Sequence, residues 1–367
     1  MNLPLLTISA RYGWMTQQSR FSASIAGREK KNYTLLEKHQ LSYNHGNSKV
    51  AIYGTVYELT DYDEALVPKV YHSFSLTPEN LSKFIEAYFH TKKLDAQLRK
   101  FIASTARMDG LLNISFDDFM KVKLFAPEQC EQSKISRIIN LIENLITLQQ
   151  RKLEQLKQLK IFTLQRMFID KDCKQPILRF KNFKDNWLPH KFNDIANTFS
   201  GGTPAISNKD YYGGNIPFIR SAEINKNTTQ LHLTPDGLKN SSAKFIKKGT
   251  LLYALYGATS GEVGIAQIDG AINQAVMAIT LKKDNVYFIK TWLIKNKRKI
   301  ISTYLQGGQG NLSAKIVKHL KLSLPKIEEE NLISITIMKI DSLIKLQQSK
   351  IDDLVNLKKY LLQKLFI

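Results

Sequence analysis

Pro325–Ile367 reads PKIEEENLISITIMKIDSLIKLQQSKIDDLVNLKKYLLQKLFI, and this stretch of the chain has an earlier copy. Pro127–Ile169 reads PEQCEQSKISRIINLIENLITLQQRKLEQLKQLKIFTLQRMFI, 198 residues before it. When the comparison is widened without a gap, Leu112–Ile169 shares 23 of 58 residues with Gly310–Ile367. Two similar long segments indicate two similar structural units, and the rest of the chain is what each segment carries.

Apolar residues recur in both copies at alternating steps of three and four residues. This spacing is a heptad repeat, which predicts a helix that packs against another helix along one stripe. A helix of about 40 residues is about 60 Å long, too long to bury against one small domain. We therefore expect the two helices to pair as an antiparallel coiled coil. The predicted pairing residues are Ile139, Ile142, Ile146, Gln149, Leu153, Leu156, Ile337, Ile340, Ile344, Gln347, Ile351 and Leu354.

Gln149 and Gln347 interrupt the apolar stripe at matching positions. A polar residue inside such a stripe usually fixes the register of the pair at some cost in stability. The alternative is that both side chains are simply solvated, and the sequence leaves the two interpretations open.

The composition favours a polyanionic partner. The chain has 367 residues, enough for two or three domains, with 53 Lys and Arg against 32 Asp and Glu and a net charge of +21. Such an excess favours nucleic acid first and a membrane surface second. The two cysteines, Cys130 and Cys173, offer no disulfide framework or metal cluster, which suits a reducing cytosol. No apolar run approaches membrane-spanning length and no signal-peptide pattern is found, so we expect a cytoplasmic protein.

The fold class expected is α+β, with two mixed α/β domains alternating with the two long helices. The expected boundaries are 1–111, 112–176, 177–310 and 311–367. Helices are expected at Pro78–Ile102 and Val286–Leu305, and strands are expected where short β-type segments lie between polar turns. These segments are Leu5–Ser9, Leu41–Asn44, Lys49–Tyr57, Val70–Leu76, Ile216–Ile219, Gly249–Tyr253, Gly264–Ile268 and Ala275–Leu281. The first mixed domain has no counterpart of Arg179–Asn215.

Catalytic motifs are missing from the sequence. The chain has no Pro-Pro pair, which excludes the Asn/Asp-Pro-Pro-aromatic motif of methyltransferases, and no G-x-x-x-x-G-K-[ST] phosphate loop. The seven His are scattered without zinc-ligand spacing. Asp63-Glu64-Ala65-Leu66 resembles a helicase Walker-B tetrad, but without a phosphate loop we interpret it as an acidic turn before a strand. We therefore expect a non-catalytic binding protein, without cofactor or metal, whose catalysis resides in partner subunits.

The candidate DNA-binding residues lie in polar, glycine-rich loops. Glycine lets the backbone approach phosphates, and Asn, Gln and Arg can form bidentate contacts to base edges. The alternatives are solvated loops and, for the two tyrosines Tyr43 and Tyr253, core aromatics. The candidates are Arg11, Tyr43, Asn44, Asn47, Ser48, Lys49 and Arg107 in the first domain, and Arg220, Lys244, Tyr253, Tyr256, Thr259, Ser260 and Gln309 in the second.

A second set of apolar residues on the first helix lies off the pairing stripe. A helix that is apolar on more than one stripe needs a further partner. That partner is another protein or, as the alternative, the globular domains of the same chain. The residues are Ile138, Leu141, Leu145, Leu148, Leu159, Phe162, Leu164 and Phe168.

The order domain, helix, domain, helix, together with several short motifs, resembles the DNA-specificity subunit of type I restriction-modification systems. In the second half the motifs are Trp187-Leu188, Asp194-Ile195, Gly201-Gly202-Thr203-Pro204, Ile216-Pro217-Phe218, Gly307–Ser313, and Leu148–Lys152 with its twin. In the first half they are Leu5–Ser9, Tyr43–Lys49, Ala65–Pro68 and Arg107–Ser115. The resemblance covers essentially the whole chain, and the order and duplication of the motifs make it specific.

The resemblance implies that each mixed domain is a target-recognition domain that reads one half of a split site on double-stranded DNA. The paired helices would separate the two domains as a ruler. Two modification subunits would bind the helices and methylate adenine, restriction subunits would join the full complex, and no membrane is involved. The first domain departs from the family pattern because it is shorter at its N-terminus. The alternative is therefore a truncated or silent copy that serves only as a recombination donor or an assembly scaffold.

Overall fold

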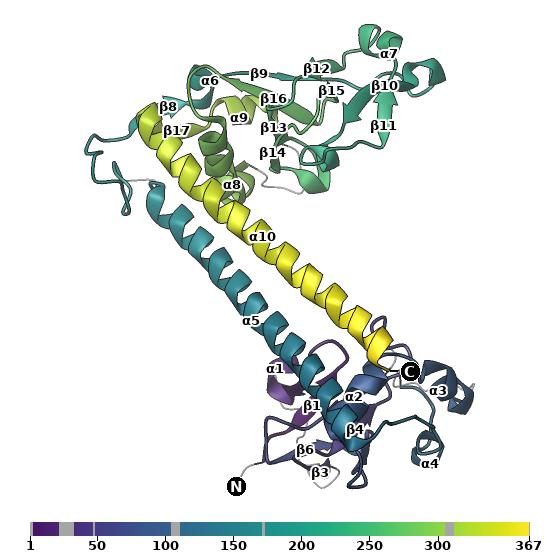
Figure 1. Cartoon of the computed structure of the whole chain (residues 1–367). Coiled ribbons are helices and arrows are strands. Elements are labelled where there is room, and N and C mark those ends of the chain that lie inside the picture. The colour runs from purple at the N-terminus through teal and green to yellow at the C-terminus, as the bar shows by residue number, and fades with distance from the viewer. Residues whose placement is uncertain are drawn as a thin grey trace. The chain divides into compact units, whose positions relative to one another are not determined.

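The structure is a computed structural model that describes residues 3–21, 33–46, 48–103, 111–170, 173–304 and 312–366. The chain divides into two compact units. Unit 1 is Met1–Leu153 together with Gln347–Ile367, and unit 2 is Glu154–Leu346. Each unit holds one mixed domain and one half of each long helix (Figure 1). None of the helices in the described ranges combines the length and the apolarity needed to cross a membrane.

The two long helices are α5 (Gln129–Met167) and α10 (Ile327–Leu365), coloured teal and yellow in Figure 1. Each has 39 residues, and their ends keep the offset of the sequence repeat. Each begins two residues after its proline, Pro127 or Pro325. All twelve predicted pairing residues are buried or half-buried, whereas most helix residues between them are exposed. The two long helices of the expected fold are therefore present, and the burial of these residues supports the predicted pairing stripe.

In unit 1 the helix halves run antiparallel. Glu143 of α5 forms an ion pair with Lys358 of α10, at 2.8 Å, and Gln347 Nε2 donates to both the backbone oxygen and Oε1 of Gln149, at 2.9 and 2.8 Å. A later residue of α5 thus meets an earlier residue of α10. Gln347 is 6% exposed, so the interpretation that the glutamines fix the register is favoured over solvation.

Unit 2 holds the equivalent contacts of the other helix halves. Lys160 of α5 pairs with Asp341 of α10 at 2.6 Å, and Met167 shares a core cluster with Ile333 and Ile337. This direction is again antiparallel. Lys160 and Asp341 are the repeat counterparts of Lys358 and Glu143, so the duplication extends to the ion pairs that flank the stripe.

Among its described residues, the mixed domain of unit 1 contains three small sheets and four short helices. The sheets have the strand orders β1-β2, β3-β6 and β5-β4-β7. The side chains of Tyr43, Phe84 and Phe119 form one core with Ile139 of α5 and with Phe366, which follows α10. The elements are β1 (Leu6–Ser9), β2 (Gly13–Thr16), α1 (Gln17–Phe21), β3 (Tyr33–Glu37), β4 (Leu41–Asn44), β5 (Thr55–Glu58), β6 (Glu64–Pro68), β7 (His72–Phe74), α2 (Ser82–His90), α3 (Asp95–Phe101) and α4 (Phe116–Phe119).

The single helix expected at Pro78–Ile102 is instead two helices, α2 and α3. Lys92 between them has φ 65°, a left-handed conformation that an α-helix cannot continue through. The strand expected over Lys49–Tyr57 is present only at its end, as β5.

The described part of the mixed domain of unit 2 contains two four-stranded sheets and one pair of strands. Their orders are β11-β10-β15-β12, β14-β13-β16-β9 and β17-β8. The elements are β8 (Leu188–Lys191), α6 (Phe192–Ile195), β9 (Ala196–Ser200), η2 (Lys209–Tyr211), β10 (Tyr212–Ile219), η3 (Ser221–Glu223), β11 (Leu231–Leu233), α7 (Pro235–Lys239), β12 (Lys244–Ile246), β13 (Leu251–Ala254), η4 (Gly257–Thr259), β14 (Val263–Ile265), β15 (Gly270–Ile272), β16 (Val276–Leu281), α8 (Val286–Tyr304), α9 (Ala314–Lys318) and β17 (Lys321–Leu324).

Each long helix ends on the same aromatic contact in its unit. Phe168, just after α5, stacks on Phe288 of α8, with ring centroids 4.9 Å apart. Phe366, just after α10, stacks on Phe84 of α2, with ring centroids 5.0 Å apart. The core contacts of α8 in unit 2 are therefore repeated by α2 in unit 1.

The start of each long helix also repeats one hydrogen bond. Glu330 Oε2 accepts from the backbone N–H of Asn285 at 2.8 Å, and its counterpart Gln132 Oε1 accepts from the backbone N–H of Leu81 at 3.0 Å. Gln132 Nε2 further donates to the backbone oxygen of Pro127 at 2.9 Å. Both side chains are buried, but only one of them carries an ionisable group.

Replacing Glu330 by Gln is expected to remove a pH-dependent loss of stability in unit 2. Burial raises the pKa of Glu330 from its usual 4.5 to about 7. The folded chain therefore binds this proton more tightly than the unfolded chain, and the resulting stability is lost as the pH rises from 4.5 through 7. At pH 8, Glu330→Gln should stabilise unit 2 by about 2–3 kcal/mol. Urea denaturation at pH 5 and pH 8 measures the difference.

The repeat supplies the reciprocal control. Gln132→Glu places a carboxyl at the buried counterpart in unit 1 and should introduce there the pH dependence that Glu330→Gln removes. Equal urea midpoints of the wild-type unit 2 at pH 5 and pH 8 would contradict the prediction.

Candidate nucleic-acid interface

Two of the candidate cations in unit 2 meet at one end of a sheet. Strand β10 runs parallel to β15, with Ile219 opposite Ile272, and β12 runs antiparallel to β15, with Lys244 opposite Ile272. Arg220 follows Ile219 directly. Because the end of β10, the end of β15 and the start of β12 coincide, Arg220 and Lys244 lie on the same edge of the sheet.

The loop Gly201–Pro204 is held against this edge by close backbone contact. A Cβ atom on Gly201 would lie 1.8 Å from the backbone oxygen of Ile272, and one on Gly202 would lie 1.8 Å from Ser242 Oγ. Only glycine fits such an approach. The next residue, Thr203, donates through Oγ1 to Oε1 of Gln274 at 2.6 Å. A Gly-rich loop is thereby added to the edge that carries Arg220 and Lys244.

The loop after β13 reaches the same region. The backbone N–H of Leu255 donates to the oxygen of Ala275, three residues beyond β15, at 2.8 Å. Tyr256 is exposed and Thr259 half-buried on this loop. Ser260 is buried, and its Oγ donates to the backbone oxygen of Leu255 at 3.1 Å, so it closes the loop from inside. Tyr256 and Thr259 remain candidates for contact, whereas Ser260 has a structural role.

Arg220 is fixed by a buried acid. Its Nε and Nη2 donate to Oε2 and Oε1 of Glu223, at 3.1 and 3.2 Å, and Nη2 also donates to Oε1 of Gln230 at 2.7 Å. Burial alone would raise the pKa of Glu223, but hydrogen bonds from the Arg220 side chain and from the backbone of Gln230 and Arg220 hold it below its usual value. The guanidinium is therefore held in one orientation by a carboxylate that is ionised at neutral pH.

Tyr43 and Tyr253 are fully buried, which favours the alternative interpretation of both as core aromatics. Tyr43 stacks on Phe119 with ring centroids 4.4 Å apart, and its hydroxyl donates to the backbone oxygen of Tyr53 at 2.7 Å. Burial raises the pKa of Tyr253 to about 12. Neither ring can contact DNA while its core is intact, and we omit both from the interface.

In unit 1, two candidate loops are held together by Asn44. Its Nδ2 donates to the backbone oxygen of Ile8 at 3.0 Å, which connects the end of β4 to β1, the strand before the turn that carries the exposed Arg11. The following loop carries Ser48, half-buried, and Lys49, exposed. Asn44 is thus a positioning residue, and the contact candidates are Arg11, Ser48 and Lys49. The candidates Asn47, Arg107 and Gln309 lie outside the described residues.

Three further residues of this site, Glu223, Gln230 and Gln274, were not predicted from the sequence. An acid three residues after Arg220 is a weak sequence signal for an i,i+3 pair. Gln230 and Gln274 contact Arg220 and Thr203 only because distant strands pair, and no local pattern indicates this.

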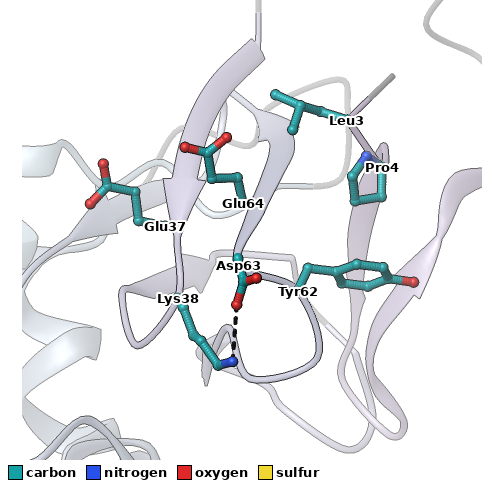
Figure 2. A pocket seen from close by; sticks show the side chains of 7 residues that line it. All are labelled: Leu3, Pro4, Glu37, Lys38, Tyr62, Asp63 and Glu64. Carbon is teal, nitrogen blue, oxygen red and sulfur yellow. Dashed lines mark hydrogen bonds and ion pairs between the residues drawn. The ribbon is translucent and has the colours of Figure 1, made fainter. Parts of the chain in front are cut away.

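A surface hollow on unit 1 does not suit DNA (Figure 2). Lys38 forms an ion pair with Asp63 at 3.0 Å, and two further carboxylates lie beside it, so the hollow is acidic and would repel phosphates. Asp63 lies in the turn before β6, as the sequence interpretation of an acidic turn expected. The hollow is lined by Leu3, Pro4, Glu37, Lys38, Tyr62, Asp63 and Glu64.

One cluster in the described part of unit 1 has the residue types of a metal site. Glu86, His90 and Glu143 place ligand atoms within 4.8 Å of one another. Lys83 contacts both carboxylates, at 2.9 and 3.0 Å, and Lys358 contacts Glu143 at 2.8 Å. The two ammonium groups already neutralise the two carboxylates. We assign this cluster to the packing of α2 against the long helices.

The off-stripe apolar residues of α5 divide into two sets. Phe168 is buried in the core of unit 2 and Leu164 packs against that core, so for these two the alternative, packing on the globular domain, is correct. Ile138 and Leu141 are exposed. Four further positions are exposed on both helices at equivalent places, namely Leu145, Leu148, Leu159 and Phe162 on α5 and Leu343, Leu346, Leu357 and Tyr360 on α10.

Comparison with known proteins connects these features to one family. Residues 184–356 match the family model described as the type I restriction modification DNA specificity domain. The chain is 27% identical over 163 residues to the type I restriction enzyme MjaIX specificity subunit of Methanocaldococcus jannaschii, which covers 41% of this chain and 37% of that protein. It is 24% identical over 250 residues to the putative type I restriction enzyme MjaX specificity subunit of the same organism, covering 64% and 56%.

The matches therefore span less than two thirds of the length of either curated relative. Among solved structures, the chain is similar to the S subunit of a type I restriction-modification system from M. genitalium. The TM-score is 0.61, the identity 16%, and the coverage 92% of this chain and 85% of that one. At this identity the likeness concerns the fold, in which two mixed domains alternate with two long helices that pair as an antiparallel coiled coil.

Proposed function

The chain belongs to the family of type I restriction-modification specificity subunits, and from this premise we propose that it is a non-catalytic subunit that binds a specific DNA sequence. The observation that carries the proposal is the edge of the unit 2 sheet, where Arg220, Lys244, Tyr256 and a Gly-rich loop gather inside the matched specificity domain. A fixed guanidinium beside an exposed lysine and an exposed ring is suited to base-edge and phosphate contacts. Methylation, ATP hydrolysis and cleavage would reside in partner subunits.

We propose that each unit reads one half of a bipartite site. Unit 2 would use the sheet edge just described, and unit 1 would use the loops of Arg11 and Lys49. The two long helices would set the distance between the half-sites, because a paired helix of 39 residues is about 58 Å long and stiff. The duplication supports this proposal, since each unit is built around equivalent halves of the long helices and an equivalent aromatic contact.

The exposed apolar positions on the long helices support a further protein partner. They recur at equivalent places on α5 and α10, which favours two similar docking surfaces and hence two modification subunits, with restriction subunits joining the full complex.

Introducing a charge at both repeat counterparts, as Leu148→Glu and Leu346→Glu, should abolish co-purification with a modification subunit. The matched control is Gln150→Glu with Gln348→Glu, at the exposed neighbouring polar positions. Retained co-purification in the leucine variant would exclude this docking surface.

A second function is favoured by one observation in unit 1. Its sheet β5-β4-β7 has three strands among the described residues, whereas the equivalent sheet β14-β13-β16-β9 of unit 2 has four. If no further strand completes this sheet, the chain would serve as an assembly scaffold or as a silent copy that donates sequence by recombination. A bipartite duplex distinguishes the two functions, because a scaffold would bind no half-site through unit 1.

Binding to DNA is expected to weaken steeply with salt, and Lys244→Ala should reduce that dependence. Lys244 is exposed and makes no ion pair with any described residue, so its loss should weaken binding to all duplexes alike. The slope of log K against log[salt] should fall by about 0.9 if Lys244 contacts one phosphate. The control is Lys157→Ala, an exposed lysine of unit 2 on α5. Gel shifts with the modification subunit present test this, and equal affinity for all duplexes at every salt concentration would refute DNA reading.

A further inference from the structure

Two parallel strands of unit 2 end side by side at the sheet edge that carries Arg220. Ile219, the last residue of β10, lies opposite Ile272, the last residue of β15. Arg220 and Asn273 directly follow these two residues, and the exposed Gln274 comes next. The side chains and backbone groups of these residues therefore decide which hydrogen-bonding groups a duplex meets at this edge.

The first backbone oxygens beyond both strands are already used as acceptors. The oxygen of Arg220 accepts from the N–H of Glu223 at 2.8 Å, and the oxygen of Asn273 accepts from the N–H of Val276 at 3.2 Å. Each carbonyl group therefore points back into its own turn and not outward from the edge.

The side-chain amides of the edge also use their oxygens within the fold. Oε1 of Gln230 accepts from Nη2 of Arg220 at 2.7 Å, and because a guanidinium can only donate, the orientation of this amide is fixed. Oδ1 of Asn273 accepts from the backbone N–H of Ala275 at 3.2 Å, which fixes the second amide. Gln274 likewise uses its Oε1 as an acceptor. The amide nitrogens of all three have no partner among the described residues, so the amides of this edge offer donors.

The guanidinium of Arg220 presents one of its nitrogens. Nε binds Glu223, and Nη2 binds both Glu223 and Gln230, whereas Nη1 has no partner among the described residues. The side chain of Arg220 is 38% exposed and that of Glu223 is 3% exposed. The buried carboxylate offsets the positive charge but holds the two N–H groups of Nη1 in one direction. Phosphate contacts depend mainly on charge and base contacts on direction, so this arrangement favours a base edge.

We propose, resting on the proposed function of unit 2, that Arg220 is a specificity-determining residue that selects guanine from the major groove. Guanine presents two acceptors there, O6 and N7, whereas adenine presents N7 beside the donor N6. An edge that offers donors from Arg220, Gln230 and Asn273 matches guanine and sets a donor against the amino group of adenine. Glu223 and Gln230 act as positioning residues that hold the guanidinium. Lys244, which has no ion pair with a described residue, suits a phosphate instead.

The first probe is a pool of duplexes of randomised sequence, bound by the full-length chain together with the modification subunit. The wild type should enrich a motif with a guanine in one half-site, and Arg220→Ala should lose the preference at that position alone. Lys244→Ala is the matched control, which should keep the guanine while its affinity falls evenly for all duplexes. A motif that Arg220→Ala leaves unchanged overturns this inference while DNA reading stands. Enrichment of no motif by the wild type refutes DNA reading and the inference with it.

A base analogue then tests the contact at the level of one atom. Substitution of 7-deazaguanine at the position that depends on Arg220 removes the N7 acceptor and keeps the Watson–Crick pairing. This change should weaken binding of the wild type by about tenfold, the effect of one lost charge-assisted hydrogen bond. It should weaken binding of Arg220→Ala little, because that protein has no guanidinium to lose its acceptor. Equal losses in the two proteins overturn the contact between Arg220 and this base.

Two further variants separate positioning from mere structural support. In Glu223→Gln the guanidinium regains its full charge and its freedom, so the preference for guanine should fall and the slope of log K against log[salt] should steepen by up to about 0.9. Gln230 is exposed, so Gln230→Glu tests the same contact without altering the core. Its carboxylate can accept from N6, and it should weaken binding to the guanine duplex more than to the duplex with adenine at that position. An unchanged base preference in both variants overturns the positioning role.

Discussion

Replacing Glu329 by Ala is expected to lower the free energy of unfolding of unit 2 by about 3–5 kcal/mol, the cost of breaking a buried ion pair by removing one partner. The carboxylate is 1% exposed, and the Arg179 side chain that it binds through two parallel hydrogen bonds is 11% exposed. Without the carboxylate, a guanidinium would stay buried with no counterion. Urea denaturation, followed by the hydrogen exchange of fragments from unit 2, measures the change.

The internal repeat supplies a control with the same helix position and residue type. Glu131 lies in the first turn of α5, as Glu329 lies in the first turn of α10. Both variants lose a favourable interaction with the helix dipole, about 0.3–1 kcal/mol, so the difference between them isolates the buried pair. Glu131→Ala should therefore cost unit 1 less than about 1 kcal/mol. Similar losses in the two variants would mean that the pair with Arg179 contributes little.

The pairing stripe could be predicted from the sequence because it depends on a local period. Residues Ile139, Ile142 and Ile146 lie within two turns of one helix, and their spacing alone decides which face they share. The partner followed from the duplication, since a second helix with the same stripe is present in the chain. The antiparallel direction and the register of the helix pair follow from the twofold symmetry of this duplication. The hydrogen bonds from Gln347 to Gln149 agree with that register.

The candidate interface could be predicted only in part, because it depends on pairing between distant strands. The sequence identified Arg220 and Lys244 as cations in polar loops. Their common edge depends on β15, which lies some 50 residues beyond Arg220 and pairs parallel to β10. The candidates Tyr43 and Tyr253 failed for a similar reason. Tyr43 is covered by Phe119, which lies 76 positions later in the chain, and no local pattern shows that ring above it.

Insertion of one heptad into both long helices is expected to lengthen the gap between the two half-sites by about three base pairs. Seven helical residues add about 10.5 Å, and base pairs stack about 3.4 Å apart. The insertions must face each other, after Gln149 in α5 and before Gln347 in α10, so that each unit keeps its own helix contacts. Copies of Gln150–Leu156 and Ile340–Leu346 would preserve the pairing stripe. Methylome sequencing with the modification subunit reads the gap directly.

Insertion into α5 alone is the control, and it should abolish DNA binding. Chain connectivity explains the contrast, because α5 begins in unit 1 and ends in unit 2 while α10 returns. A single longer helix then has no partner for its added heptad, and the pairs Glu143–Lys358 and Lys160–Asp341 cannot both be kept. Affinity should also fall in the double insertion, since three base pairs turn the duplex by about a third of a turn. An unchanged gap in the double insertion would refute the ruler, because the distance between the half-sites would then be set by the domains and not by the helices.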